Sequence, residues 1–160
     1  MPEPRQPSLS FRVLQWGLHR YWRVTRGLTL GVRAVILDPN GRIFLIRHTY
    51  IPGWHLPGGG VEAGETALEA LRREVREEAR IEIRGTPEPY GVLFNAKVSR
   101  RDHVLVYVIR DFTVIAPKTP DSEIAEAGFF PIDGLPEGTT EATRRRLAEI
   151  LSGAPSAQTW

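Results

Sequence analysis

Apolar residues along this chain follow first a helical period, then a strand period, and then a helical one again. Eight apolar side chains within residues 9–24 share one side of a helical wheel, which predicts an amphipathic helix. Residues 28–37 and 42–48 are rich in Leu, Val and Ile on either side of Asp38-Pro39-Asn40-Gly41, which predicts a β-hairpin. A loop rich in glycine and proline then leads into a second helical pattern at residues 66–79.

Strand patterns and one more helix follow. Strands are predicted at residues 81–94, with a Gly-Thr-Pro break, and at residues 103–113, and a last helix at residues 140–151. Strands and helices mix without regular βαβ alternation, so we expect an α/β fold with a central mixed sheet covered by helices. The predicted organisation is a tail and helical extension at residues 1–27, one domain at residues 28–153 and a tail at residues 154–160.

Composition narrows the class of protein. The chain has 160 residues, a length that suits one domain, and average apolar and charged fractions. It has no cysteine, which excludes disulfides, a thiolate nucleophile and cysteine-bound zinc, and fits the cytoplasm. The net charge of +2 lacks the excess typical of a dedicated nucleic-acid binder.

The predicted helix at residues 9–24 has an apolar face that needs a partner. Packing on its own domain, or on a second copy in a homodimer, is the commoner use of such a face. Contact with an anionic membrane surface is the alternative, which we do not favour. No apolar run reaches the roughly 18 residues that a membrane-spanning helix needs.

The helix predicted at residues 66–79 carries an unusual cluster of charge. Glu74, Glu77 and Glu78 fall together beside its apolar stripe, near the helix end whose dipole disfavours anions. Arg73 cannot neutralise three carboxylates. Magnesium prefers carboxylate and water oxygens and commonly bridges them to substrate phosphates, so it is the compensating charge that we expect.

The same stretch matches a longer pattern. It reads Gly59, five residues, Glu65, seven residues, and then Arg-Glu-Val-Arg-Glu-Glu-Ala-Arg-Ile at residues 73–81. This resembles the Nudix box, although Arg80 stands where that family usually has glycine. That glycine looks like a helix C-terminal turn, which other residues adopt at a cost of about 1 kcal/mol. The resemblance continues on both sides of the box and covers residues 28–151.

The resemblance implies a fold and a set of roles. The fold would be an α/β/α sandwich around a mixed sheet. Mg²⁺, or alternatively Mn²⁺, would be held by Glu74, Glu77, Glu78 and the Gly58 carbonyl. The general base stays open between Glu74 and Glu123, and Gly59, Glu65 and Arg73 would support the site.

Substrate contacts are less visible in the sequence. Arg33, Arg42 and Arg47 lie in predicted strands that could border the cleft, and we select only Arg47 as a candidate substrate contact. We expect Trp54 to anchor its loop to the core, because a large aromatic residue before a Pro-Gly loop does so more often than it stacks on a nucleobase.

The expected function is hydrolysis of a phosphoanhydride bond in a nucleoside diphosphate linked to another group. Nucleoside triphosphates, ADP-ribose and sugar nucleotides all fit. Removal of pyrophosphate from an RNA 5′ end is a second enzymatic reading, although basic residues cluster only at positions 100–101 and 144–146. A nucleotide-sensing module without turnover is the alternative from another class, and the three intact glutamates argue against it.

Overall fold

The computed structural model describes Tyr21 and residues 27–160, so the helix predicted at residues 9–24 lies almost wholly outside the described residues. The elements in chain order are β1 (Thr29–Ile36), β2 (Arg42–His48), β3 (Trp54–His55), α2 (Ala67–Ala79), β4 (Ile81–Ile83), β5 (Glu88–Phe94), β6 (Asp102–Ile109), β7 (Phe112–Val114), β8 (Ile124–Pro131), η1 (Ile132–Gly134) and α3 (Glu141–Ser152). Among the described residues, we find no helix with the length and apolarity needed to cross a bilayer.

The strands pair in both directions, as expected of a mixed sheet. In the order β1-β6-β5, β1 runs parallel to β6 and β5 runs antiparallel to it. In the order β3-β2-β8 the pairs are antiparallel, and β4 and β7 form a short antiparallel pair of their own. The predicted strands at residues 81–94 and 103–113 each divide in two, because β4 and β7 leave their longer neighbours to pair with each other.

The predicted hairpin forms its turn but not its ladder. The Asp38 carboxylate accepts hydrogen bonds from the Asn40 and Arg42 amides, both at 2.9 Å, and stabilises the turn. Beyond a single bridge between Leu37 and Ile43, however, β1 and β2 separate into different groups of strands. The reason is that β6 pairs with β1 along its whole length, while β8 pairs with β2.

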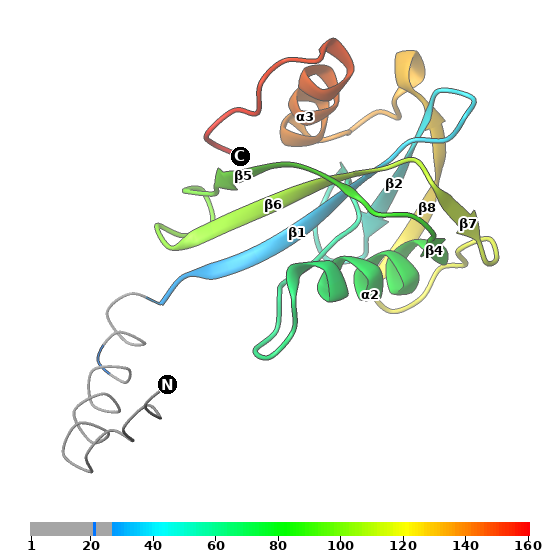
Figure 1. Ribbon diagram of the computed structural model, residues 1–160. Helices are drawn as coiled ribbons and strands as arrows, with labels where there is room; N and C mark the ends of the chain where they lie inside the picture. The colour runs from blue at the N-terminus through cyan, green and yellow to red at the C-terminus, as the bar shows by residue number, and fades with distance from the viewer. Residues whose placement is uncertain (1–20, 22–26) are drawn as a thin grey trace, which may run out of the picture.

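Two apolar layers lie on opposite faces of the strands. Val32, Ala34 and Ile36 of β1 join Leu71 and Val75 of α2 in one buried cluster. The alternate residues Val35 and Leu37 join Leu147 of α3 in the other cluster. Figure 1 shows α2 and α3 on the two sides of the strands. The period of two in the strands therefore fills both layers, and the predicted sandwich is confirmed.

Local sequence fixes both ends of α2. Thr66 and Glu69 form a reciprocal capping box, in which the Thr66 hydroxyl accepts from the Glu69 amide and the Glu69 carboxylate accepts from the Thr66 amide. The helix ends at Arg80, whose φ of 54° and ψ of 41° are left-handed. This is the turn expected at the position where the Nudix box has glycine.

The loop between β2 and α2 is held down by an aromatic anchor. Trp54 is only 6% exposed, and its ring meets the edge of Phe130 at a centroid distance of 4.7 Å. Trp54 also pairs with Arg47 in the two-residue strand β3. The predicted anchoring role of Trp54 is therefore confirmed, although the short strand that it forms was not predicted.

Candidate active site

Glu78 is the buried charged residue of α2. It sits next to Ala79 on the packed side of the helix, is 7% exposed, and its Oε2 accepts a hydrogen bond from the Gly58 amide at 2.7 Å. Burial, with a further contribution from the Glu74 charge, raises the pKa of Glu78 to about 7. The hydrogen bond from Gly58 lowers this pKa but does not outweigh the effect of burial. The fold therefore holds a carboxylate where its charge is poorly solvated.

The Gly58-Gly59 loop can lie between β1 and the Glu74 carboxylate because neither residue has a side chain. A Cβ on Gly58, whose φ is +142°, would stand 2.0 Å from the Val32 carbonyl oxygen. A Cβ on Gly59 would stand 2.2 Å from the Glu74 Oε1 atom. The loop is fixed to β1 by hydrogen bonds from the Val32 amide to the Gly59 carbonyl and from the Ala34 amide to Pro57, both at 2.8 Å.

Arg73 joins the helix to the loop. Its Nε and Nη2 donate to the Glu65 carboxylate at 2.9 and 3.1 Å, and its Nη1 donates to Glu74 at 2.7 Å. Nη2 also donates to the Gly60 carbonyl at 3.2 Å. These contacts raise the pKa of Arg73 and lower the pKa of Glu65. Arg73 therefore lies inside the glutamate network.

Glu77 is the most exposed of the three glutamates. Its side chain is 62% exposed, and its Oε2 is 3.7 Å from Arg73 Nη1. In the part of the chain that the structure describes, no three His, Cys, Asp or Glu side chains are grouped closely enough to hold a metal ion together. Adjacent helix positions differ by about 100° in direction, so Glu78 packs against the Gly58 loop while Glu77 is exposed, although both border one pocket.

Glu123 borders the same pocket as Glu77 and Glu78. The pocket encloses about 500 Å³, including space open to solvent, and Lys118, Asp121, Ser122 and Ile124 complete its lining. The Asp121 carboxylate accepts from the Glu123 and Ile124 amides at 2.9 and 2.8 Å and so shapes this loop. Lys118 donates to the Glu77 carbonyl at 2.9 Å and ties the loop to the end of α2.

Arg33, which the sequence indicated as one of three strand arginines that could border the cleft but which was not selected as a substrate contact, lies in the site. Its guanidinium donates a hydrogen bond to the Gly58 carbonyl, the backbone group expected to serve as a metal ligand. Burial lowers the pKa of Arg33, while the neighbouring charges of Glu78 and Glu74 raise it. An arginine stays protonated in such a place, so it is a fixed positive charge beside the carboxylates.

His48 is a site residue that the sequence did not reveal. Its Nε2 lies 3.9 Å from the Glu78 Oε1 atom, and its ring centroid is 5.1 Å from that of Tyr50 and 5.7 Å from that of His55. Burial, together with the charges of His55 and Arg33, lowers the pKa of His48. His48 is therefore a neutral polar group at pH 7, beside the buried carboxylate.

Arg47, the predicted substrate contact, has other partners. It forms an ion pair with Glu126 at 2.8 Å, and its guanidinium lies 5.8 Å from the Trp54 ring centroid. Neighbouring positions on a strand face opposite ways, and here His48 is the one that turns towards Glu78. A role for Arg47 in substrate binding stays a proposal.

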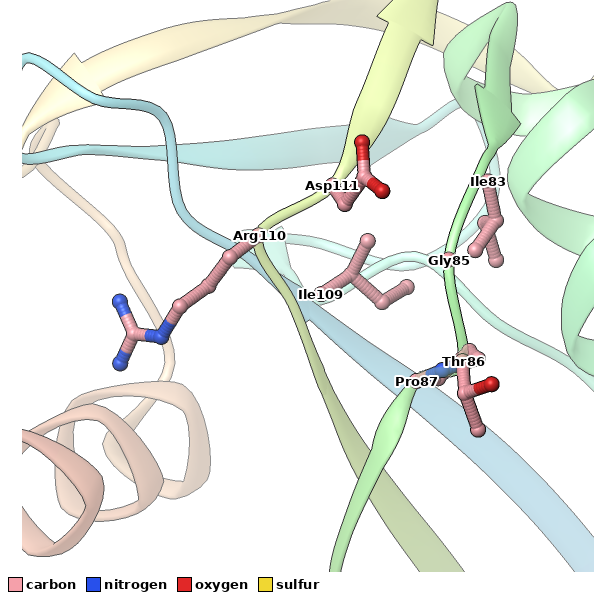
Figure 2. Close-up of a pocket in the computed structure, with 7 residues that line it drawn as sticks. All are labelled: Ile83, Gly85, Thr86, Pro87, Ile109, Arg110 and Asp111. Atoms are coloured by element: carbon pink, nitrogen blue, oxygen red, sulfur yellow. The ribbon is translucent and has the colours of Figure 1, made fainter.

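A smaller hollow between the β4–β5 connection and the β6–β7 turn is a poorer candidate (Figure 2). It encloses about 150 Å³, including space open to solvent, compared with about 500 Å³ for the pocket that Glu78 lines. Its lining includes Ile83, Thr86 and Ile109, and Figure 2 shows the Arg110 side chain extending away from them. The chemistry-bearing residues therefore gather at the other pocket.

The donor set around Glu78 fits a divalent ion such as Mg²⁺. That ion usually takes one or two carboxylates and fills its octahedron with waters and substrate phosphate oxygens, so three converging carboxylates are not required. Glu78 is a buried carboxylate with a like charge nearby, which an added cation would compensate. The Gly58 carbonyl has a second lone pair in addition to the one that Arg33 uses.

Comparison with known proteins gives independent information on the family to which the chain belongs. The sequence matches the NUDIX domain family over residues 27–150. It is 30% identical over 119 residues to an 8-oxo-dGDP phosphatase of Mus musculus, which covers 71% of this chain and 36% of that protein. It is 44% identical over 52 residues to an RNA pyrophosphohydrolase of Halorhodospira halophila, covering 32% of this chain and 29% of the relative. The match therefore spans about a third of these relatives' length.

Solved structures agree with the sequence match. A MutT NUDIX hydrolase from Burkholderia pseudomallei superposes with a TM-score of 0.62 at 30% identity, over 76% of this chain and 97% of that one. The family match, this superposition and the loop-helix geometry around Glu78 converge on one assignment. The chain belongs to the Nudix hydrolase family.

Proposed function

We propose that this protein is a divalent-metal-dependent hydrolase that cleaves a phosphoanhydride bond in a nucleoside diphosphate linked to another moiety. The observation that carries the proposal is the buried Glu78 carboxylate, bonded to the Gly58 amide beside Glu74 and lining one pocket with Glu123. A phosphoanhydride is itself rich in negative charge. Several carboxylates would repel such a substrate unless bound cations lie between the carboxylates and the substrate phosphates.

Each residue then has a part in the reaction. Glu74 and Glu78 would hold the ion with the Gly58 carbonyl, and Glu77 would join them or bind through water. When bound, the ion neutralises developing charge on the phosphates and makes water a better nucleophile. Arg33 supplies a fixed positive charge that the phosphate oxygens can meet.

Glu123 is the general base that we favour. Arg73 already binds the Glu74 carboxylate, and Glu78 is buried, whereas Glu123 is exposed at the pocket wall. Within the described residues, no hydrogen bond occupies its carboxylate. The water molecule would transfer a proton to Glu123 while the water oxygen bonds to phosphorus and the bridging P–O bond breaks. The products are a nucleoside monophosphate and a phosphorylated remainder.

Carboxamide variants test this assignment. We expect Glu78→Gln to lose most turnover at saturating magnesium, and Glu123→Gln to lose about 100-fold or more in kcat because a base is removed. Glu62→Gln changes an exposed carboxylate in the neighbouring loop and is the matched control. Full activity of Glu78→Gln with magnesium in excess would refute the metal role of this residue.

Removal of pyrophosphate from an RNA 5′ end is a second candidate, favoured by the local identity to an RNA pyrophosphohydrolase. The structure supplies less basic surface for it than the sequence indicates. Arg146 is 1% exposed, and Arg144 donates to the Thr139 carbonyl at 3.2 Å. An RNA oligonucleotide with a 5′ triphosphate, compared with free GTP, separates the two candidates through the ratio of their kcat/KM values.

A further inference from the structure

The segment at residues 154–160 is docked on the domain. It runs from α3 back to β5 (Figure 1), where the Phe94 amide donates to the Gln158 carbonyl at 2.8 Å and the Trp160 amide donates to the Phe94 carbonyl at 3.0 Å. A Cβ on Gly91 of β5 would lie 2.1 Å from the Ser156 Oγ atom. The strand therefore has a glycine where the segment passes.

A buried arginine holds this segment in place. Arg146 of α3 is 1% exposed, and it donates to the Thr159 carbonyl at 2.9 Å and to Glu149 at 2.6 Å. Its guanidinium lies 5.9 Å from the centroid of the Trp160 ring. Burying a cation is costly unless its hydrogen bonds are provided, so these contacts fix the backbone around Trp160.

Trp160 forms one wall of a cavity on this side of the molecule. The cavity encloses about 410 Å³, including space open to solvent. The other lining residues are Arg33, His55, Leu56, Thr140, Ala142 and Thr143. The cavity thus combines a half-buried indole with hydroxyl groups, an imidazole and a cation.

Arg33 connects this cavity to the candidate active site. It lines the cavity, and its guanidinium donates to the Gly58 carbonyl, while the amide of the same Gly58 donates to Glu78. A ligand that spans Arg33 would therefore have one end in the cavity and the other near the carboxylates. A nucleotide has that form, with a flat apolar base at one end and phosphates at the other.

We propose that this cavity receives the nucleobase of the substrate, and that the base stacks on Trp160 while the adjacent phosphate meets Arg33. The inference rests on the proposed function. Indole rings offer a large rigid face for stacking, and the loss of one such contact is typically a large loss of affinity. Residues 154–160, which the sequence indicates as a tail, then determine which substrates the enzyme accepts.

Two measurements on the full chain test the proposal. The first is calorimetric binding of AMP, GMP, CMP and UMP in EDTA, with ribose 5-phosphate as the ligand without a base. The second is steady-state kinetics on the best nucleotide substrate, compared with 5-phosphoribosyl pyrophosphate, a diphosphate without a base. We expect Trp160→Ala to weaken nucleotide binding and raise KM by roughly 5- to 100-fold with little change in kcat. The ligands without a base should be unaffected.

Two further variants separate stacking from a loss of structure. Trp160→Phe keeps an aromatic face and should restore most of the affinity. Tyr90→Phe removes hydrogen bonds to Ala154 and Glu149, at 3.2 and 3.4 Å, and is the control for a loosened segment. An unchanged nucleotide affinity in Trp160→Ala would overturn the inference. An absence of turnover in the unmodified protein would instead overturn the proposed function, while the binding measurement would still test the cavity.

Discussion

Replacing Glu78 by glutamine should make the metal-free protein more stable at alkaline pH. The carboxylate is 7% exposed, and burial raises its pKa to about 7 from an ordinary value of 4.5. Glutamine keeps an oxygen that can accept from the Gly58 amide but never carries a charge. The variant therefore removes the cost of a buried anion and retains the hydrogen bond.

The sign and size of the effect follow from proton linkage. Because the pKa of Glu78 is raised by folding, its protonation stabilises the folded chain below pH 4.5, and this contribution is lost as the pH rises through 7. Each tenfold change in proton affinity is worth about 1.4 kcal/mol. At about pH 8.5 the free energy of unfolding of Glu78→Gln should therefore exceed that of the unmodified protein by about 3 kcal/mol. At about pH 4 the two values should nearly coincide.

Urea denaturation in EDTA, followed by circular dichroism at both pH values, measures this difference. Glu77→Gln is the matched control, since the neighbouring side chain is 62% exposed and its replacement should leave the free energy of unfolding nearly unchanged. Magnesium in place of EDTA should favour the unmodified protein, because a ligand that binds the folded state stabilises it. If Glu78→Gln in EDTA were no more stable at pH 8.5 than the unmodified chain, the argument from burial would be wrong.

Three other substitutions and one matched control have definite expected outcomes. Arg80→Gly should raise the free energy of unfolding by about 1 kcal/mol, measured by urea denaturation, because Arg80 has a positive φ of 54° that glycine adopts without strain. Gly59→Ala should lower magnesium-dependent turnover roughly tenfold or more, since the methyl group would displace the Glu74 carboxylate, whereas Gly60→Ala meets nothing within 4 Å and should be silent. Arg73→Lys should raise the half-saturating magnesium concentration roughly tenfold or more, because lysine cannot replace the fork to Glu65 and Glu74; an unchanged magnesium titration would count against that role.

Most elements of the fold could be predicted from patterns within short stretches of the sequence. The apolar period at residues 66–79 identified α2 to within one residue, because both the apolar stripe and the loop rich in glycine and proline before it are local features of the sequence. The turn at Arg80 could likewise be predicted from nearby residues. The separation of β1 from β2 could not be predicted in this way, because it depends on strands β6 and β8, which lie more than 60 residues further along the chain.

The site could be proposed where its residues share a short stretch of chain, or where the family resemblance extends beyond the box, as it does for Glu123. The loop and the glutamates of α2 belong to one pattern, so Gly58, Glu74 and Glu78 could be proposed together. Arg33 could be named only as one of three strand arginines near the cleft, because its contact with the Gly58 carbonyl joins positions 25 residues apart. Arg146 looks like part of a basic surface run in the sequence, and its burial depends on how residues 154–160 fold back.

The central claim is tested most directly by product analysis. The purified protein would be incubated with nucleoside triphosphates, ADP-ribose, other sugar nucleotides and dinucleoside polyphosphates, with magnesium or with EDTA, and all products identified by chromatography. The account predicts cleavage of a phosphoanhydride bond in at least one of these classes, with magnesium only, and little cleavage by Glu78→Gln. Measurable nucleotide binding without cleavage of any compound would contradict it and favour a sensor.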